Sequence, residues 1–337
     1  MGKPPGKCYP LPLNIAGMGH YVPQNVISSQ ALEEERSLEP GWCEKNLGIR
    51  ERRWITGETP SFLGAKAARE ALAVAGMEAD DIDLIVSASG TAALERGLPD
   101  GGPLLQRHLG LEGSGIPCFT MHNNDLGFML ALDNCSAMLN AGRYENILLV
   151  CAEVFSRNLD DDNPHVYGLF GDGAAAAVLR PPRPGENSSI LGARFETHSA
   201  AAADYHSLMG LALSGRTTIS PGDLSLHIDS RSFSDHSRRF MAGLLDRFSQ
   251  ERADIRQDIG LFSAPPPGQP FLYSLMVGGA KPQSLDTGMM QWGFCGAAAI
   301  PLALCQAVSQ GKVARGDRLL LVGAGAGLAV GAMILSY

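Results

Sequence analysis

The 337-residue chain is predicted to adopt an α/β layered fold built from two similar halves. Short apolar runs alternate with segments of helical periodicity, which is typical of sheets covered by helices. Each half contains strand–helix–strand units around one apolar segment rich in glycine and alanine, which predicts a buried helix in each half. The proline-rich stretch Pro181–Gly185 separates the halves, between which no residue-by-residue repeat is visible.

The first half, residues 13–182, is expected to begin with a strand at Leu13–Gly17, followed by a loop through Pro23. A helix over Ser61–Gly76 has an alanine-rich inner face and ends on glycine, which commonly terminates helices. The remaining predicted elements, in chain order, are a strand at Asp83–Ser89, a short helix at Pro103–Leu109, a strand at Gly115–Met121, a long apolar helix from near Asn124 to Gly142, and strands at Asn146–Ala152 and Gly173–Leu179.

The second half, residues 183–337, follows the same alternation. A helix is expected over roughly Phe233–Ser249, and a second buried helix over Cys295–Val308. Strands are predicted near Ile190 and at Leu224–Ile228, Ile259–Ser263, Arg318–Val322 and Gly331–Leu335.

Composition excludes several classes of protein. Hydrophobic residues make up 45% of the chain, enough for a large core, and charged residues 18%, below the roughly 25% of an average domain, so disorder is not expected. The net charge is −8 without a Lys/Arg run, so we expect no nucleic-acid binding. No stretch approaches the roughly 20 apolar residues of a membrane span, and Met1–Pro12 lacks the apolar core of a signal peptide. These observations predict a cytoplasmic protein.

Several motifs superficially resemble ligand sites. Gly323–Gly331 (GAGAGLAVG) resembles a dinucleotide fingerprint, but it lies between two terminal strands with no helix after it. Asp160–Asp162 could bind a cation, but no spaced set of oxygen ligands follows. The seven cysteines have no zinc spacing and are interpreted as reduced thiols. We therefore expect no metal and no cofactor. Four histidines are isolated in the sequence, and their spacing pairs none of them with a nucleophile: His20, His108, His165 and His227.

Four stretches of the sequence carry a resemblance to a known enzyme family. They are Gly48–Arg52 (GIRER) after Trp42, Pro117–Phe128 (PCFTMHNNDLGF), Phe170–Leu179 (FGDGAAAAVL) and Leu320–Gly331 (LLVGAGAGLAVG). In this order and at these intervals they resemble the ketoacyl-synthase III branch of the thiolase superfamily, collinearly from about Ile15 to Leu335. The resemblance implies a thiolase-like, five-layered αβαβα fold of two duplicated halves, usually dimeric, in which two buried helices present the active site.

The resemblance also locates the family's catalytic residues, and all three differ here. The family's nucleophilic cysteine begins the first buried helix, just before a small or apolar residue and Gly-Phe, and Asp125 occupies that position. The interval places the family's histidine at Pro265. The family's asparagine, which follows a glycine before the second buried helix, is replaced by Phe294.

The three replacements change the chemistry of the expected site. A helix N-terminus favours the ionised carboxylate of Asp125 for the same reason that it favours a thiolate, but a carboxylate is a poor nucleophile toward a thioester. Neither Pro265 nor Phe294 has a side-chain donor that could stabilise an oxyanion. Two interpretations of Asp125 stay open: a helix cap in a vestigial site, or a general acid or base with His122 as its partner.

Three cysteines lie near the expected site. Cys118 on the preceding strand and Cys135 within the first buried helix are interpreted as packed thiols, since neither is at a helix N-terminus. Cys295 could face the same cavity, but without a base it would be a weakly activated thiol.

The family's substrate path is only half preserved. Trp42 matches the tryptophan that in relatives stacks on the adenine of coenzyme A, whereas the basic residue one turn further on is Asn46, next to Lys45. The loop residue that in relatives reaches across the dimer into the acyl pocket falls at Leu98.

The leading hypothesis is a ketoacyl-synthase III-like protein of secondary-metabolite biosynthesis, in which polyketide, alkylquinolone or fatty-acid-derived products are made. It would be a catalytically silent subunit, a homodimer alone and a heterodimer with an active paralogue, with the strand Gly115–Met121 pairing across the dimer axis. The alternative is an acyltransferase, cyclase or hydrolase that uses Asp125 as acid or base. A third hypothesis is a binding protein for acyl carrier protein or acyl-CoA.

Overall fold

The structure is a computed structural model of the 337-residue chain. Within the described segments, no helix has both the length and the apolar character needed to cross a bilayer. The residues that the structure describes are 9–91, 101–157, 159, 162–199, 205–207, 226–228, 230–252, 259–264, 288–325 and 327–337.

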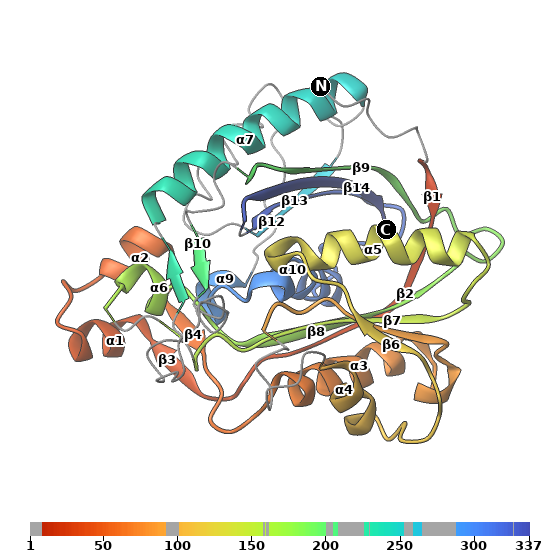
Figure 1. Cartoon of the computed structure of the whole chain (residues 1–337), viewed down its shortest axis with the longest axis horizontal. Helices are drawn as coiled ribbons and strands as arrows, with labels where there is room; N and C mark the ends of the chain where they lie inside the picture. Colours follow the sequence, from red (N-terminus) through yellow and green to blue (C-terminus); the bar gives the residue numbers. More distant parts are fainter. Residues whose placement is uncertain are drawn as a thin grey trace, which may run out of the picture.

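Five layers of secondary structure are stacked in the molecule (Figure 1). Helices α3 (Pro60–Ala75) and α4 (Gly102–His108) cover one sheet on its outer face, and α7 (Ser230–Glu251) covers the other sheet. Helices α5 (Gly127–Asn140) and α10 (Ala299–Ser309) lie between the two sheets and contact both. The predicted thiolase-like αβαβα architecture, with two buried helices at its centre, is confirmed.

The first sheet has the strand order β2-β8-β7-β5-β6. These strands are β2 (Asn14–Tyr21), β8 (Gly173–Arg180), β7 (Ile147–Glu153), β5 (Leu84–Ser87) and β6 (Cys118–Thr120). Strand β8 is antiparallel to both neighbours, whereas β7, β5 and β6 run parallel. Strands β7 and β5 are buried along their whole length, as expected where helices cover both faces of a sheet.

The second sheet has the order β1-β9-β14-β13-β12. Its strands are β1 (Leu11–Pro12), β9 (Ser189–Thr197), β14 (Ala329–Ser336), β13 (Arg318–Gly325) and β12 (Ile259–Ala264). The pairing of β9, β14, β13 and β12 repeats that of β2, β8, β7 and β5, directions included. Two halves of one topology thus face each other across α5 and α10.

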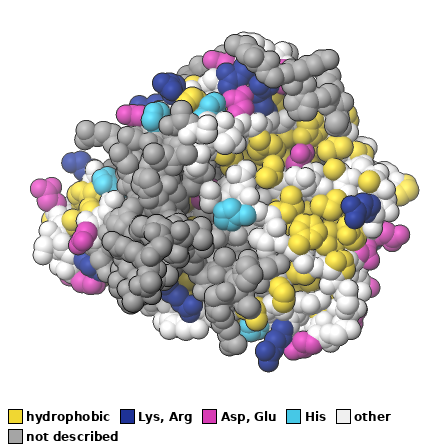
Figure 2. Space-filling view, in the orientation of Figure 1, with side chains coloured by type: hydrophobic (Ala, Val, Ile, Leu, Met, Phe, Trp, Pro, Cys, Tyr) yellow, Lys and Arg dark blue, Asp and Glu magenta, His cyan; other side chains and the backbone are white. Residues whose placement is uncertain are grey.

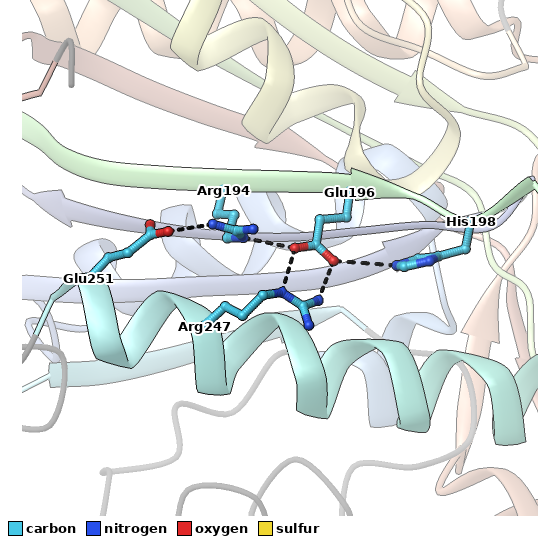
Figure 3. A network of polar contacts seen from close by, with 5 residues as sticks. All are labelled: Arg194, Glu196, His198, Arg247 and Glu251. Atoms are coloured by element: carbon cyan, nitrogen blue, oxygen red, sulfur yellow. Dashed lines mark hydrogen bonds and ion pairs between the residues drawn. The ribbon is translucent and has the colours of Figure 1, made fainter. Parts of the chain in front are cut away.

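Helix α7 is fixed to the second sheet by a network of charged side chains (Figure 3). Arg194 and Glu196 lie on one face of β9, because alternate residues of a strand share a face, and His198 directly follows the strand. The Glu196 carboxylate lies 2.8 Å from Arg194, 2.5 Å from Arg247 and 3.4 Å from His198, and Arg194 also pairs with Glu251 at 2.6 Å. Two of these residues, Arg247 and Glu251, come from α7, so the network joins the helix to the strand.

Edge strand β6 has one hydrogen-bonded side and one outward side. The N–H of Met121 donates to the Ser87 carbonyl at 2.8 Å, and the N–H of Ile85 donates to the Pro117 carbonyl at 3.0 Å. In a parallel strand, every second residue forms its main-chain hydrogen bonds with the same neighbouring strand. The main-chain groups of Phe119, between Pro117 and Met121, therefore also face β5. A cross-dimer pairing of this strand would therefore use Cys118 and Thr120.

Some predicted boundaries were wrong. The expected loop after Gly17 is instead the continuation of β2 to Tyr21, and Gly17 and Gly19 belong to it because α3 crosses closely there. A Cβ on Gly17 would lie 2.3 Å from the Ala71 carbonyl oxygen. The described part of the strand expected at Leu224–Ile228 pairs in a separate two-stranded sheet.

Several short elements were not predicted. They are helices α1 (Ser29–Glu35), α2 (Trp42–Leu47), α6 (Pro164–Tyr167) and α9 (Met289–Trp292), strands β3 (Val26–Ser28), β4 (Glu51–Arg53) and β10 (Tyr205–Ser207), and a 3₁₀ turn at Ala79–Asp81. Strand β11 (Leu226–Ile228) lies within the strand expected at Leu224–Ile228, and 3₁₀ turns at Asn124–Leu126 and Gly296–Ala298 lie at the starts of the two expected buried helices.

Candidate functional site

The N-terminus of buried helix α5 forms the centre of the candidate site. Asp125 lies in the 3₁₀ turn that leads into α5, and its side chain is buried, with 7% of the residue exposed. Asn124 before it has a φ of 44°, in the left-handed region that asparagine tolerates better than most residues. Gly127 lets the helix begin against the end of β5, since a Cβ there would lie 2.5 Å from the Ala88 carbonyl oxygen.

Two glycines from distant parts of the chain flank the Asp125 carboxylate. A Cβ on Gly325, at the end of β13, would lie 3.5 Å from Oδ2 and 3.2 Å from the main-chain nitrogen of Asp125. A Cβ on Gly296, in the turn before α10, would lie 3.3 Å from Oδ1. The Gly323–Gly331 motif lies within the β13–β14 hairpin, as expected. Its glycine at 325 makes room for Asp125, which is a packing role.

Aromatic rings form one wall next to this carboxylate. Phe294 is 1% exposed, and its main chain bonds to Leu169 at 2.9 Å and Gly171 at 3.1 Å. Its ring centroid lies 5.6 Å from that of Phe170, which lies 4.5 Å from that of Phe155. A Cβ on Gly296 would lie 2.8 Å from Cζ of Phe155, so the rings reach the turn that flanks Asp125. Pro265, the third predicted position, lies outside the described residues.

A second buried carboxyl group, not identified from the sequence, contacts the same turn. Glu153 ends β7 and is 1% exposed. Its oxygens accept hydrogen bonds from Gly90 N at 2.6 Å, Thr91 N at 2.8 Å and Thr91 Oγ1 at 2.6 Å, and from the main chain of Ala297. Burial raises the pKa of Glu153 to about 7, although these hydrogen bonds favour the ionised form. The group therefore titrates near neutral pH.

Asp172 of the FGDG motif positions the aromatic wall. It is fully buried, and its carboxylate accepts hydrogen bonds from the main-chain nitrogens of Ile55, Phe155 and Ser156 at 2.8, 2.8 and 3.0 Å, and from Ser156 Oγ at 2.5 Å. Burial raises the pKa of Asp172, whereas the four donors favour its ionised form. Both oxygens are thus satisfied, and the motif holds the chain at Phe155 in place.

The thiols near the site are packed rather than activated. Burial raises the pKa of Cys135 to about 12 and that of Cys295 well above its ordinary value. The Sγ of Cys295 lies 3.7 Å from the Gly293 carbonyl oxygen. Cys118 is half-buried on the edge strand β6. Neither Cys135 nor Cys295 can supply a thiolate near neutral pH.

No described histidine contacts an activated nucleophile, because burial raises the pKa of Cys305, the one thiol beside a described histidine, to about 12. His122, the partner of Asp125 in the acid–base interpretation, has its Nε2 3.1 Å from Asn124 Oδ1. His20 Nδ1 lies 3.2 Å from Glu70 and 3.7 Å from the thiol of Cys305. The His108 ring packs edge-on against Phe62, and the side chain of His227 lies outside the described part. Among the described residues no cluster of three or more His, Cys, Asp and Glu side chains could hold a metal ion.

Trp42, where the resemblance predicts coenzyme A binding, contacts neighbouring side chains. The half-buried indole begins α2 and packs edge-on against His165, with ring centroids 5.0 Å apart at 69°. The side-chain amide of Asn46 donates to the Trp42 carbonyl at 2.8 Å, while Lys45 is exposed. The amide of Asn46 is thus engaged within the helix. Leu98 lies outside the described residues.

Comparisons with known proteins agree along nearly the whole chain. Residues 119–199 match the family described as 3-oxoacyl-[acyl-carrier-protein (ACP)] synthase III, and residues 279–337 match its C-terminal part. A β-ketoacyl-ACP synthase III of Neisseria meningitidis serogroup C is 30% identical over 328 residues, which are 96% of this chain and 98% of that protein. The corresponding protein of Aquifex aeolicus is 28% identical over 333 residues, 96% of this chain and 99% of its own.

Solved structures of this kind share the fold. The crystal structure of 3-oxoacyl-ACP synthase III from Aquifex aeolicus superposes with a TM-score of 0.84 at 26% identity, covering 96% of this chain and 100% of that one. The priming β-ketosynthase of the R1128 polyketide pathway gives 0.81 at 23% identity, covering 98% of each chain.

Proposed function

Because the chain belongs to the 3-oxoacyl-ACP synthase III family of condensing enzymes, we propose that it is a catalytically silent subunit of such an enzyme. It pairs with an active homologue that keeps the family's cysteine, histidine and asparagine. The assembly acts in secondary-metabolite biosynthesis, on polyketide, alkylquinolone or fatty-acid-derived products. The free thiols among the described cysteines fit a reducing compartment, and we assign the protein to the cytoplasm.

The observation that carries this proposal is the carboxylate at the start of α5. Asp125 holds the position that the resemblance assigns to the nucleophilic cysteine, and it is buried between Gly296 and Gly325. A carboxylate attacks a thioester poorly, and a mixed anhydride formed there would hydrolyse. The buried ring of Phe294 offers no donor, and loss of one oxyanion donor costs about 3 kcal/mol of transition-state stabilisation.

The edge of the first sheet supports pairing with a second chain of this fold. Strand β6 is half-buried at every residue, and the half-buried side chains of Phe119, Met121 and Met138 pack around it and α5. Figure 2 shows hydrophobic side chains gathered where Figure 1 places α5 and β6. Strand β6 is the last strand in the order of the first sheet, and an edge strand beside an apolar surface favours association, so we propose a dimer here.

The substrates of the assembly would be acyl-CoA or acyl carrier protein. The chemistry would occur in the active partner, and Trp42 of this chain would retain at most a binding role. Its indole already packs against His165, and the family's basic position one turn further along α2 is occupied by Asn46, with Lys45 next to it.

One observation favours a second candidate, a cysteine-free acyltransferase, cyclase or hydrolase. Glu153, with a pKa of about 7, accepts a hydrogen bond from the main chain of Ala297, and the carboxyl group of Asp125 lies beside Gly296, so two carboxyl groups suited to acid–base chemistry contact one turn. This candidate requires turnover by the purified chain alone, which the silent-subunit proposal forbids.

Co-expression with a homologue that has an intact catalytic triad tests the proposal. We expect a heterodimer by size exclusion and native mass, and an activity higher than that of the homologue alone. Thr120→Pro, which removes an outward N–H of β6, should abolish co-purification, whereas Thr56→Pro in an exposed turn serves as a control for proline itself. If the homologue works at full rate as its own homodimer and never co-purifies with this chain, the proposal fails.

A further inference from the structure

A pocket of about 500 Å³ lies at the end of the molecule opposite to Asp125. Strand β8 connects the two regions: Gly173 at its start packs against Cys295, and Arg180 at its end lines the pocket. Gly173 and Arg180 are seven residues apart, and at about 3.3 Å per residue the strand separates them by roughly 23 Å. The volume is in the range of small-molecule sites. The pocket is therefore separate from the candidate catalytic site.

Both halves of the fold and the segment between them contribute walls. The first half supplies the start of β2 and the residues after α3, and the second half supplies the residues that flank β13 and β14. The connecting segment closes the pocket with Arg183, Gly185 and Glu186. Ala16, Ala75 and Met77 provide the apolar part of the lining.

Positive charge exceeds negative charge among the lining side chains. These include three arginines, at 180, 183 and 315, against the carboxylate of Glu186. That carboxylate is fully engaged: Arg180 donates to both its oxygens at 2.8 and 3.0 Å, and the Arg183 N–H and the Asn14 side-chain amide donate to Oε2. These hydrogen bonds, chiefly that from Arg180, lower the pKa of Glu186. The charge of Arg183 also acts on Glu186, whereas Arg315 has no carboxylate partner in the described part of the chain.

Arg315 is exposed, and two contacts orient its guanidinium group. Its guanidinium carbon lies 4.3 Å from the ring centroid of Tyr337, and Nη2 donates to the Ile15 carbonyl at 2.7 Å. One of five N–H donors is thus used within the described residues. A guanidinium stacked on a ring is preorganised to bind an oxyanion through two parallel hydrogen bonds.

A buried acceptor without a partner lies in the same wall. Asn14 is 2% exposed, and the hydrogen bond from Nδ2 to Glu186 fixes which end of its amide is the oxygen. Within the described structure, its Oδ1 has no hydrogen-bond partner. A buried acceptor of this kind requires a donor, and a ligand with a hydroxyl or amino group would supply one.

We propose that this pocket binds a small organic oxyanion, a hydroxy acid or a phosphate ester, with its anionic group on Arg315 and Arg183 and its hydroxyl toward Asn14. The apolar lining contacts the carbon body of the ligand. Because the pocket is remote from Asp125, the ligand is an effector rather than a substrate. The proposal is independent of the silent-subunit function, since it concerns other residues and is tested by binding alone.

Isothermal titration at constant ionic strength tests the proposal with the full-length protein. The probes are malate, glycerol 3-phosphate and inorganic phosphate, which separate carboxylate from phosphate recognition and show the value of the hydroxyl group. We expect saturable one-to-one binding of malate or glycerol 3-phosphate, tighter than that of inorganic phosphate. Arg315→Gln and Arg183→Gln should each weaken it by about tenfold or more, as removal of a charged hydrogen-bond donor does.

Arg107→Gln is the matched control, because Arg107 is an exposed arginine of α4 paired with Glu112 far from the pocket. It should bind the probes like the wild type. Arg183→Gln keeps the test decisive even if Arg315→Gln does not fold, since Arg183 is exposed in the connecting segment. Absence of saturable binding by every probe overturns the proposal, and so does an equal loss in Arg107→Gln.

Discussion

Substituting asparagine for Phe294 distinguishes a packed core beside Asp125 from an open polar cavity. The ring of Phe294 is 1% exposed and packs against Phe170, which packs against Phe155. Asparagine is the residue that the resemblance places here in active relatives. An open site that had only lost its catalytic groups would tolerate asparagine at 294 without loss of stability, whereas a repacked apolar core would be destabilised.

The expected cost follows from the two changes that the substitution makes. Loss of a buried phenylalanine side chain costs about 3–5 kcal/mol, of which the smaller asparagine recovers a part. The amide then faces aromatic carbon, and an unsatisfied buried polar group costs about 1–3 kcal/mol. We expect Phe294→Asn to lower the free energy of unfolding by about 4 kcal/mol.

Urea denaturation at one fixed protein concentration measures this loss, because the stability of the proposed dimer would depend on concentration. If the m-value is unchanged, the shift of the urea midpoint gives the difference in unfolding free energy between the variant and the wild type. Phe62→Asn is the matched control: the same chemical change on α3, where the ring is half-buried, should cost about 2 kcal/mol or less. A loss below about 1 kcal/mol for Phe294→Asn would refute the repacked core.

Two further outcomes follow from the buried titratable groups. Burial raises the folded-state pKa of Glu153 from 4.5 to about 7, so the folded protein keeps a proton that the unfolded chain releases. The unfolding free energy of the wild type minus that of Glu153→Gln should therefore fall, by up to about 3 kcal/mol, from about pH 5 to pH 8; a difference independent of pH contradicts the burial argument. Native Cys135 and Cys295 should resist iodoacetamide at about pH 8 and react once the protein is unfolded. Rapid native alkylation of either would contradict their assignment as packed thiols.

The layers of the fold could be predicted because they depend on long, strongly patterned segments. The run Asn146–Ala152 is apolar throughout, and the structure buries β7 at every residue. Gly76 ends α3 in the left-handed conformation, with a φ of 67°, as its place after the alanine-rich helix indicated. By contrast, β3 and β4 have three residues each, too few to establish a period.

The candidate site could be predicted only in part, for a different reason. Asp125 was found through the short motif around it, which is local in the sequence. Glu153 was missed because its partners come from other segments: Gly90 and Thr91 follow β5, and Ala297 precedes α10. An acidic residue at the end of a wholly apolar run was the one available signal, and tertiary contacts were needed to interpret it.

The intact mass of the purified chain after incubation with acyl-CoA tests the central claim most directly. An active homologue that has the family's cysteine, treated in the same way, shows that the acyl donor is competent. We predict no mass change for this chain, because Asp125 forms no stable acyl derivative and the buried thiols are not ionised. A stoichiometric acyl adduct that maps to Asp125 or to any residue lining the site would contradict the claim.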